Sequence, residues 1–139
     1  VAAANIAHAG LAARLDAIGG DLCVDEIGSD YDLVWCASVL HFVPDLPAAL
    51  RKIHAALKPG GVLVCVQAEI AAMPDAAARV LPYYLGMRML GRHVTRQGEL
   101  AAQLQAHGWR HVEQYQASNF PMAPMQVIIA RKAAMAHEA

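Results

Sequence analysis

The order of apolar and polar positions divides the chain into alternating strand-like and helix-like segments. Residues 31–40, YDLVWCASVL, are rich in Val and Leu and show little alternation, which is typical of a strand covered on both faces in a parallel sheet. Residues 45–58 carry apolar side chains at helical spacing. The expected buried stripe of this helix comprises Leu46, Leu50, Ile53 and Leu57. Residues 61–68, GVLVCVQA, predict a second buried strand, so the segment from 31 to 68 predicts a βαβ unit with a right-handed crossover.

The ends of the central helix carry the residues that helix ends prefer. Asp45 is a good N-cap residue, and Pro47 fits the first turn, where a missing N–H costs nothing. Pro59 cannot continue the helix, and Gly60 and Gly61 permit the backbone to reverse. The Pro-Gly-Gly sequence is therefore expected to end the helix and to direct the chain back into the sheet.

The N-terminal segment predicts two elements before this unit. Residues 1–15 begin as an Ala-rich helix, and Gly10 is expected just past its C-terminus. Residues 14–22, RLDAIGGDL, predict a short strand that enters a Gly-Gly turn.

The segment after the unit predicts helices and two closing strands. Pro74, Pro82, Gly86 and Gly91 interrupt the apolar residues 70–93, so we expect broken helices there rather than one long helix. A cleaner helix is expected between an N-cap at Thr95 and Gly108, with Leu100 and Leu104 buried.

The last two strands are expected at residues 111–116 and 126–131, joined by residues 117–124, ASNFPMAP. Strands near 32–37, 62–67, 111–116 and 126–131 are expected to form one continuous sheet whose last strand is antiparallel. No repeat and no linker divides the chain, which we interpret as a single domain over residues 1–139.

Composition narrows the classes of function. The chain has 139 residues, of which 57% are hydrophobic and 17% are charged, and its net charge is −1. No long run of one charge favours a nucleic-acid or membrane-surface partner, and no apolar run has the length of a membrane span. Cys23, Cys36 and Cys65 are odd in number and lie in apolar segments, so we expect buried free thiols in a cytoplasmic protein.

The sequence YDLVWCASVLHFVPDLPAALRKIHAALKPGGVLVCVQAE resembles the second half of the class I S-adenosylmethionine-dependent methyltransferases. In that family an acidic-aliphatic strand leads to a "vLHhvpD" loop, a helix, "LkPGG" and another strand. GLAARLDAIGGDL and VTRQGELAAQLQAHGWRHVEQYQ extend the resemblance to almost the whole chain. The resemblance implies an α/β, Rossmann-like sheet that is mostly parallel and has an antiparallel last strand.

A narrower resemblance is to small-molecule O-methyltransferases, in which a His after the fourth strand acts as general base. His41 of LHFVPD stands at that place, although FVP replaces the usual residues. A Glu after the fifth strand holds that His in the family, and Glu69 follows His41 at the family's spacing of 28 positions. His93 falls near the family's second helper carboxylate and is not one. The resemblance thus implies His41 and Glu69 as catalytic residues, with a polar loop His and a solvated strand-end carboxylate as the alternative interpretations.

The same resemblance implies the cofactor-binding residues. Asp21 and Leu22 would lie beside the adenine of S-adenosylmethionine, and Ala37 would line the cofactor pocket. Asp21 has an alternative interpretation as a turn residue that binds nearby backbone.

The family's Gly-rich loop and the acidic residue after its second strand have no counterpart in this sequence. We therefore expect a domain that is truncated at its N-terminus, lacks the first two strands and binds S-adenosylmethionine weakly by itself.

Other interpretations remain open at this stage. The chain is either a methyltransferase that acts on a small-molecule acceptor, or a non-catalytic module that does not bind cofactor by itself. A nucleotide-dependent oxidoreductase is a weaker alternative, because the chain has no dinucleotide-binding fingerprint. The Met-rich segment with Tyr83 and Tyr84 suits a flat apolar acceptor, ordinary core or a homodimer surface. The histidines show no metal-ligand spacing.

Overall fold

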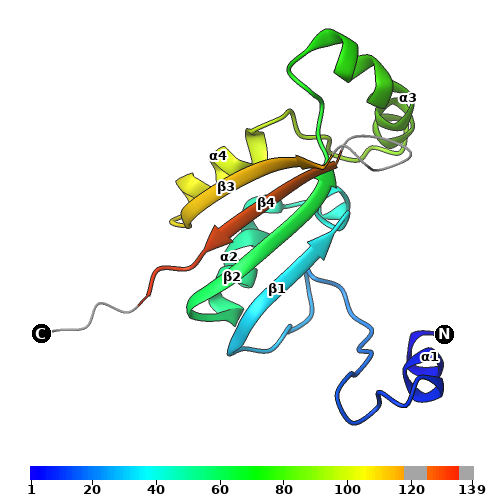
Figure 1. Ribbon diagram of the computed structural model, residues 1–139, viewed down its shortest axis with the longest axis vertical. Coiled ribbons are helices and arrows are strands. Elements are labelled where there is room, and N and C mark those ends of the chain that lie inside the picture. Colours follow the sequence, from blue (N-terminus) through cyan, green and yellow to red (C-terminus); the bar gives the residue numbers. More distant parts are fainter. Residues whose placement is uncertain (118–124, 135–139) are drawn as a thin grey trace, which may run out of the picture.

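The computed structural model describes residues 1–117 and 125–134 and is built around a four-stranded sheet with the order β1-β2-β4-β3 (Figure 1). Its strands are β1 (Tyr31–Ala37), β2 (Leu57–Ala68), β3 (Arg110–Ala117) and β4 (Met125–Arg131). β1 and β2 are parallel, and β4 is antiparallel to both β2 and β3. The prediction of one continuous sheet with an antiparallel last strand is confirmed. The expected connection through residues 118–124 lies outside the described residues.

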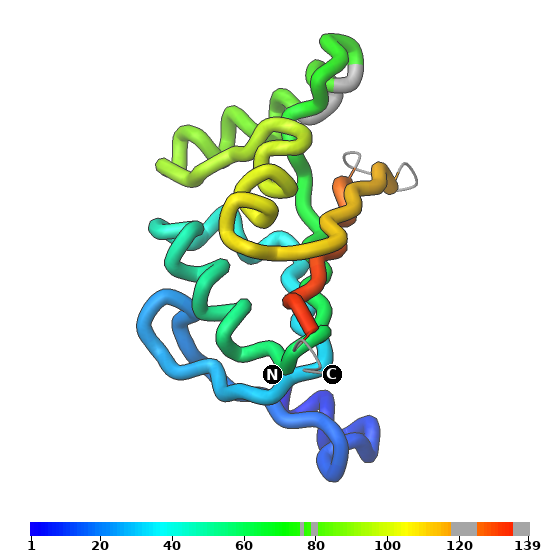
Figure 2. The backbone as a smooth tube through the Cα atoms, turned by 90° about the vertical axis from the view of Figure 1, so that its left-hand side faces the viewer, coloured from blue at the N-terminus to red at the C-terminus, as the bar shows by residue number. Residues whose placement is uncertain are grey.

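The helical elements of the described residues lie on one face of the sheet, beyond its end and, for the N-terminal helix, away from the sheet (Figure 1). They are α1 (Ala2–His8), the 3₁₀ turn η1 (Leu40–Phe42), α2 (Leu46–Ala56), α3 (Pro74–Met89) and α4 (Glu99–Ala106). Figure 2 shows α2 and α4 on the same side of the sheet, whereas α3 lies beyond the end of β2. In the described part of the chain, no helix is long and apolar enough to cross a membrane.

The main core lies between the sheet and helices α2 and α4. The expected stripe of α2 is buried, with Leu50 at 0% and Ile53 at 1% exposure. Leu100 and Leu104 of α4 are equally inaccessible and belong to the same cluster. The sheet contributes buried side chains from its two central strands to this core: Leu63, Cys65, Ile128 and Ala130.

Several of the expected helix ends are confirmed. The Asp45 side chain caps α2 by accepting a hydrogen bond from the Ala48 N–H at 2.9 Å. Gly10 and Gly108 follow α1 and α4 with φ angles of 69° and 84°, the left-handed conformation that glycine adopts without strain. Pro-Gly-Gly does not end α2 as expected: the helix ends at Ala56, and residues 59–61 lie within β2, which begins at Leu57.

The expectation of broken helices in residues 70–93 is wrong. α3 runs as one helix from Pro74 to Met89, with Pro82 inside it. Pro74 occupies the first turn, where it removes no helical hydrogen bond. Pro82 and Ala78 are both exposed, so water can reach the Ala78 carbonyl that Pro82 leaves without an N–H donor.

The predicted N-cap of α4 and the predicted N-terminal strand are also wrong. Gly98, not Thr95, is the N-cap residue of α4, because Thr95 is buried and its hydroxyl accepts a hydrogen bond from Gln67 Nε2 at 3.0 Å. The strand expected near residues 14–18 is not formed; residues 9–30, all of which are described, contain turns and irregular backbone. Leu22 and Ile27 of this stretch pack against the main core without forming a strand.

Two expectations about burial are also corrected. Cys23 is exposed, whereas Cys36 and Cys65 are buried free thiols. Strand β1 is not covered on both faces, since Leu33 is 52% and Trp35 is 62% exposed.

The cap of α2 provides a test of the fold. We expect Asp45→Ala to lower the free energy of unfolding by about 1 kcal/mol, because the Ala48 N–H loses its partner. Asp45→Asn retains an oxygen that can accept the same bond and serves as the control. Urea denaturation of the two variants checks this, and equal stability of Asp45→Ala and wild type would contradict the role of the cap.

Candidate functional site

The carboxyl ends of β1 and β2 meet at one edge of the sheet and bring three of the predicted site residues to it. Ala37 ends β1 and pairs in register with Val66. The Ser38 N–H then donates to the Val66 carbonyl at 2.8 Å, which keeps the two strand ends aligned. His41 follows in η1 and Glu69 follows β2 directly. This is the edge at which open α/β sheets bind ligands.

His41 is buried at this edge, with an exposed fraction of 3%. Its Nε2 atom has no hydrogen-bond partner among the described residues. The imidazole ring meets the Tyr83 ring edge-on, with 6.4 Å between the centroids. Burial lowers the pKa of His41 below its usual value, and a hydrogen bond with the backbone of His93 opposes that shift. The ring is therefore neutral near pH 7 and has a nitrogen that can take up a proton.

Glu69 is more deeply buried and is held by groups from other elements. Its exposed fraction is 1%, and its Oε2 accepts hydrogen bonds from the Gly98 N–H at 3.1 Å and from Gln114 Nε2 at 2.9 Å. Its Oε1 has no partner among the described residues. No hydrogen bond joins Glu69 to His41 within residues 1–117 and 125–134, so the role of Glu69 in orienting His41 stays a prediction.

Tyr84 on α3 is a third buried polar side chain near this edge. It is 4% exposed, packs with Ala68 at the end of β2, and meets the Tyr83 ring at 5.7 Å between centroids. Its hydroxyl has no partner among the described residues. Burial, and next the charge of Glu69, raise the pKa of Tyr84 well above its usual value, so it remains a protonated donor.

Together, His41, Glu69 and Tyr84 place three unpartnered polar atoms around the end of β2. A buried polar atom without a partner costs about 1–3 kcal/mol, so such a group in a native fold calls for a water or a ligand as partner. Because these atoms comprise an imidazole nitrogen, a carboxylate oxygen and a phenol, the edge can accept a proton and hydrogen-bond a polar ligand.

The predicted cofactor residues Asp21 and Leu22 line a separate hollow of about 250 Å³. Asp21 Oδ1 accepts the Cys23 N–H at 2.7 Å, which is the turn interaction that was the alternative interpretation. Its other oxygen takes part in no hydrogen bond within the described residues. Lys52 Nζ donates to the Leu22 carbonyl at 3.2 Å and so fastens this loop to α2. Contact of Asp21, Leu22 and Ala37 with a cofactor stays a prediction.

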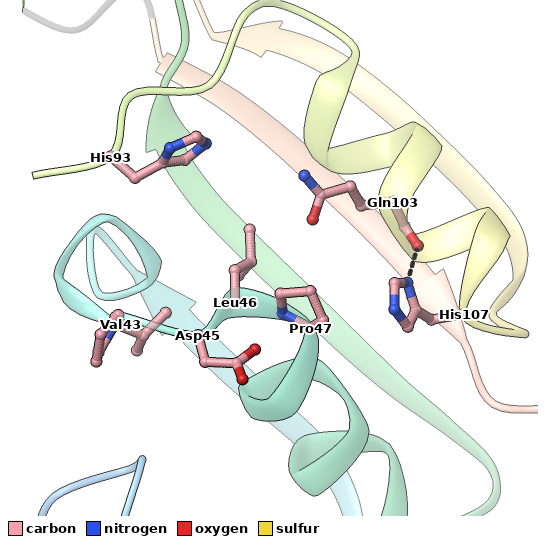
Figure 3. A pocket seen from close by; sticks show the side chains of 8 residues that line it. Val43, Asp45, Leu46, Pro47, His93, Gln103 and His107 are labelled. Atoms are coloured by element: carbon pink, nitrogen blue, oxygen red, sulfur yellow. Dashed lines mark hydrogen bonds between the residues drawn. The ribbon is translucent and has the colours of Figure 1, made fainter.

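A larger hollow, of about 470 Å³, lies between the start of α2, α4 and the loop that holds His93 (Figure 3). The Gln103 amide points toward it from α4, and the backbone carbonyl of Gln103 bonds His107 Nδ1 at 2.8 Å. Val43, which follows η1, forms part of its wall. The hollow thus adjoins the turn that carries His41, although His41 does not line it.

Sequence reasoning missed the partners of Glu69. Gln114 lies on β3 and also donates to Gln126 of β4 at 3.0 Å, so both glutamines point to one face of the sheet. Polar residues at strand positions that face the core are the signal that could have indicated this network. Tyr84 was expected in an acceptor pocket, in ordinary core or at a homodimer surface, and its burial agrees with the first two. Within residues 1–117 and 125–134, no cluster of three or more His, Cys, Asp or Glu side chains could hold a metal ion.

Comparison with known proteins gives concordant matches. The profile of a methyltransferase domain family matches residues 1–63. A structure from Nostoc punctiforme, described as a candidate O-methyltransferase, is 25% identical with a TM-score of 0.72 and covers 94% of this chain. PigF, solved with S-adenosylhomocysteine, is 20% identical with a TM-score of 0.70 over 93% of this chain, a similarity that concerns the fold. A curated relative, highly reducing polyketide synthase 2 of Gibberella zeae, is 48% identical over 50 residues, which are 34% of this chain.

The chain spans a minor part of these proteins. It covers 41% of the Nostoc structure, 38% of PigF and 2% of the polyketide synthase. The matches confirm the family resemblance and the α/β fold that it implied.

The hydrogen bonds of Glu69 provide a test of the site. We expect Glu69→Ala to lower the free energy of unfolding by about 2–4 kcal/mol, because it leaves Gly98 N–H and Gln114 Nε2 without their acceptor. Glu69→Gln keeps an acceptor oxygen and should cost less. Chemical denaturation measures both variants, and an unchanged stability of Glu69→Ala would show that these bonds do not hold the site together.

Proposed function

We propose that the chain, which is similar to a methyltransferase domain family over residues 1–63 and to a candidate O-methyltransferase structure, transfers a methyl group from S-adenosylmethionine to a hydroxyl oxygen of a small molecule. The observation that supports this proposal most is the buried His41 at the carboxyl edge of the sheet, whose Nε2 has no hydrogen-bond partner among residues 1–117 and 125–134. A neutral imidazole there can take the proton of a hydroxyl group as its oxygen attacks.

The roles of the residues follow from their surroundings. When bound, S-adenosylmethionine supplies a methyl group on a positively charged sulfur. An acceptor hydroxyl would take this methyl group in place of its proton, and His41 Nε2 would receive that proton. Burial disfavours the resulting imidazolium, and in our proposal the charge of Glu69 offsets part of that cost.

The cofactor is proposed to contact the exposed Ala37 and the loop of Asp21 and Leu22. Asp21 has a carboxylate oxygen left for an amino-group donor, and Leu22 offers an apolar surface in the same hollow. We also propose a small-molecule acceptor rather than nucleic acid, because the net charge is −1 and nucleic-acid binding depends on a basic surface.

A second candidate is a methyltransferase-like module that does not bind cofactor by itself. Its support is the exposed face of β1, where Leu33 and Trp35 reach 52% and 62% exposure. Calorimetric titration of residues 1–139 with S-adenosylhomocysteine tests this second candidate. Tight, saturable binding would refute the module.

Replacement of the proposed base tests the chemistry. In a protein that contains this chain and transfers methyl groups, His41→Ala should lower kcat about 10²- to 10⁴-fold, because a positioned base contributes that much. Cofactor affinity should change little, and Phe42→Ala, in the same turn, is the control. Steady-state kinetics with a phenolic acceptor measures the effect, and a kcat near wild type would refute the assignment of His41 as base.

The pH dependence gives an independent test. Because burial lowers the pKa of His41, the neutral base persists below its ordinary pKa of about 6.5. The rate should therefore fall to half of its plateau only at a pH below 6.5. A pH–rate profile that is already half-maximal at or above pH 6.5 would contradict a buried base.

A further inference from the structure

A third hollow, of about 370 Å³, lies between α3 and the strand-like segment before α4. One wall is a single face of α3, because Leu81, Tyr84, Leu85 and Arg88 follow each other at helical spacing. Its volume is within the range of small-molecule pockets. Neither His41 nor the predicted cofactor residues line it.

The opposite wall is fixed by backbone hydrogen bonds. Ile70 and Arg96 form a parallel bridge, in which the Ile70 N–H donates to the Thr95 carbonyl at 2.9 Å and the Gln97 N–H donates to the Ile70 carbonyl at 2.8 Å. This bridge fixes the backbone of Arg96 on the wall opposite Arg88. A ligand that binds Arg96 therefore does not lose free energy by ordering a loop. Ile70 and Val94 supply apolar surface on the same side.

The charges of the hollow are unbalanced. Arg88 and Arg96 both line it, and neither forms an ion pair within residues 1–117 and 125–134. Glu99 also lines it, but its Oε2 accepts the Arg96 backbone N–H at 2.9 Å and its Oε1 lies 3.4 Å from His93 Nε2. The Glu99 carboxylate therefore interacts with the Arg96 backbone and with His93. The guanidinium donors of Arg88 and Arg96 remain available to a ligand.

A buried donor adds a second, independent observation. Tyr84 lines the hollow, is 4% exposed, and its hydroxyl has no partner in the described part of the chain. The burial that raises its pKa keeps the hydroxyl protonated. The hollow therefore combines apolar walls, two cationic forks that suit a carboxylate and one neutral donor.

We propose that this hollow binds a small amphipathic carboxylate, whose apolar body packs between α3 and Ile70 and whose carboxylate is held by Arg88 and Arg96. Tyr84 donates a hydrogen bond to a polar group of the same ligand. The proposal does not rest on the proposed methyl transfer, because it needs neither cofactor nor His41. It also explains why two arginines flank an apolar hollow.

The test compares two probes of nearly equal shape on the chain of residues 1–139. 2-Naphthoate should bind at least about tenfold more tightly than 2-naphthalenemethanol, which lacks the carboxylate, and its affinity should fall as salt is added. Calorimetry or amide-resonance shifts measure both. No binding of 2-naphthoate at millimolar concentration, or equal binding of the two probes, would overturn the proposal.

Matched arginine variants locate the binding. Arg88→Gln and Arg96→Gln should each weaken 2-naphthoate binding about 5- to 30-fold, as expected for the loss of one charged hydrogen-bond donor. Arg92→Gln is the control, because Arg92 lies over the Phe42 ring at 5.3 Å and does not line the hollow. Equal weakening by all three variants would indicate general attraction to positive charge and would refute the site.

Tyr84→Phe removes one oxygen and keeps the aromatic packing. It should weaken 2-naphthoate binding by a smaller factor, about 2- to 10-fold, without lowering thermal stability, since the hydroxyl has no partner in the described residues. If this variant unfolds at a lower temperature and binds the probe unchanged, Tyr84 has a structural role and the proposed ligand contact is wrong.

Discussion

The buried carboxylate of Glu69 is the interaction on which the arrangement of the site depends. It stands at the end of β2 and binds a backbone N–H of Gly98, before α4, and the side chain of Gln114, on β3. These partners are 29 and 45 positions away in the sequence. A charge removed from water is tolerated when such donors surround it, so the carboxylate fixes the end of β2, the start of α4 and the register of β3 together.

The path of the chain between Glu69 and Gly98 follows from the hydrogen bond that joins these two residues. The chain leaves the sheet at the end of β2 and must return to the same point. The bridge between Ile70 and Arg96 joins the two ends of this segment. Helix α3 is therefore held beyond the carboxyl ends of the strands (Figure 1). That position carries Tyr83 to the His41 ring, so the same fastening that orders the sheet also encloses the candidate base.

The sequence predicted the sheet because its strands are short apolar runs and its central helix has an unambiguous stripe and cap. Asp45 and Leu50, for example, do in the structure what their types and spacing indicate. It did not predict a continuous α3, since the effect of Pro82 depends on whether the freed Ala78 carbonyl faces water or the core. The sequence analysis also misplaced the start of α4, because Thr95 forms a hydrogen bond with Gln67, which lies 28 positions away in the sequence.

The site residues were predictable to different degrees. His41 and Glu69 were singled out by the resemblance to small-molecule O-methyltransferases, and the structure places both at the carboxyl edge of the sheet and buries them. The partners of Glu69 and the unpaired state of Arg88 and Arg96 depend on contacts between distant elements. Residue types and local spacing do not indicate which distant elements come into contact.

The central claim is that His41 is a neutral, buried imidazole with a free Nε2 at the carboxyl edge of the sheet. The most direct measurement is a ¹⁵N NMR titration of its side chain in the chain of residues 1–139, with the resonance assigned by comparison with His41→Ala. The structure predicts a neutral ring at pH 7, protonated at Nδ1, with a pKa below about 6.5. A pKa at or above that value, or a proton on Nε2, would contradict the account.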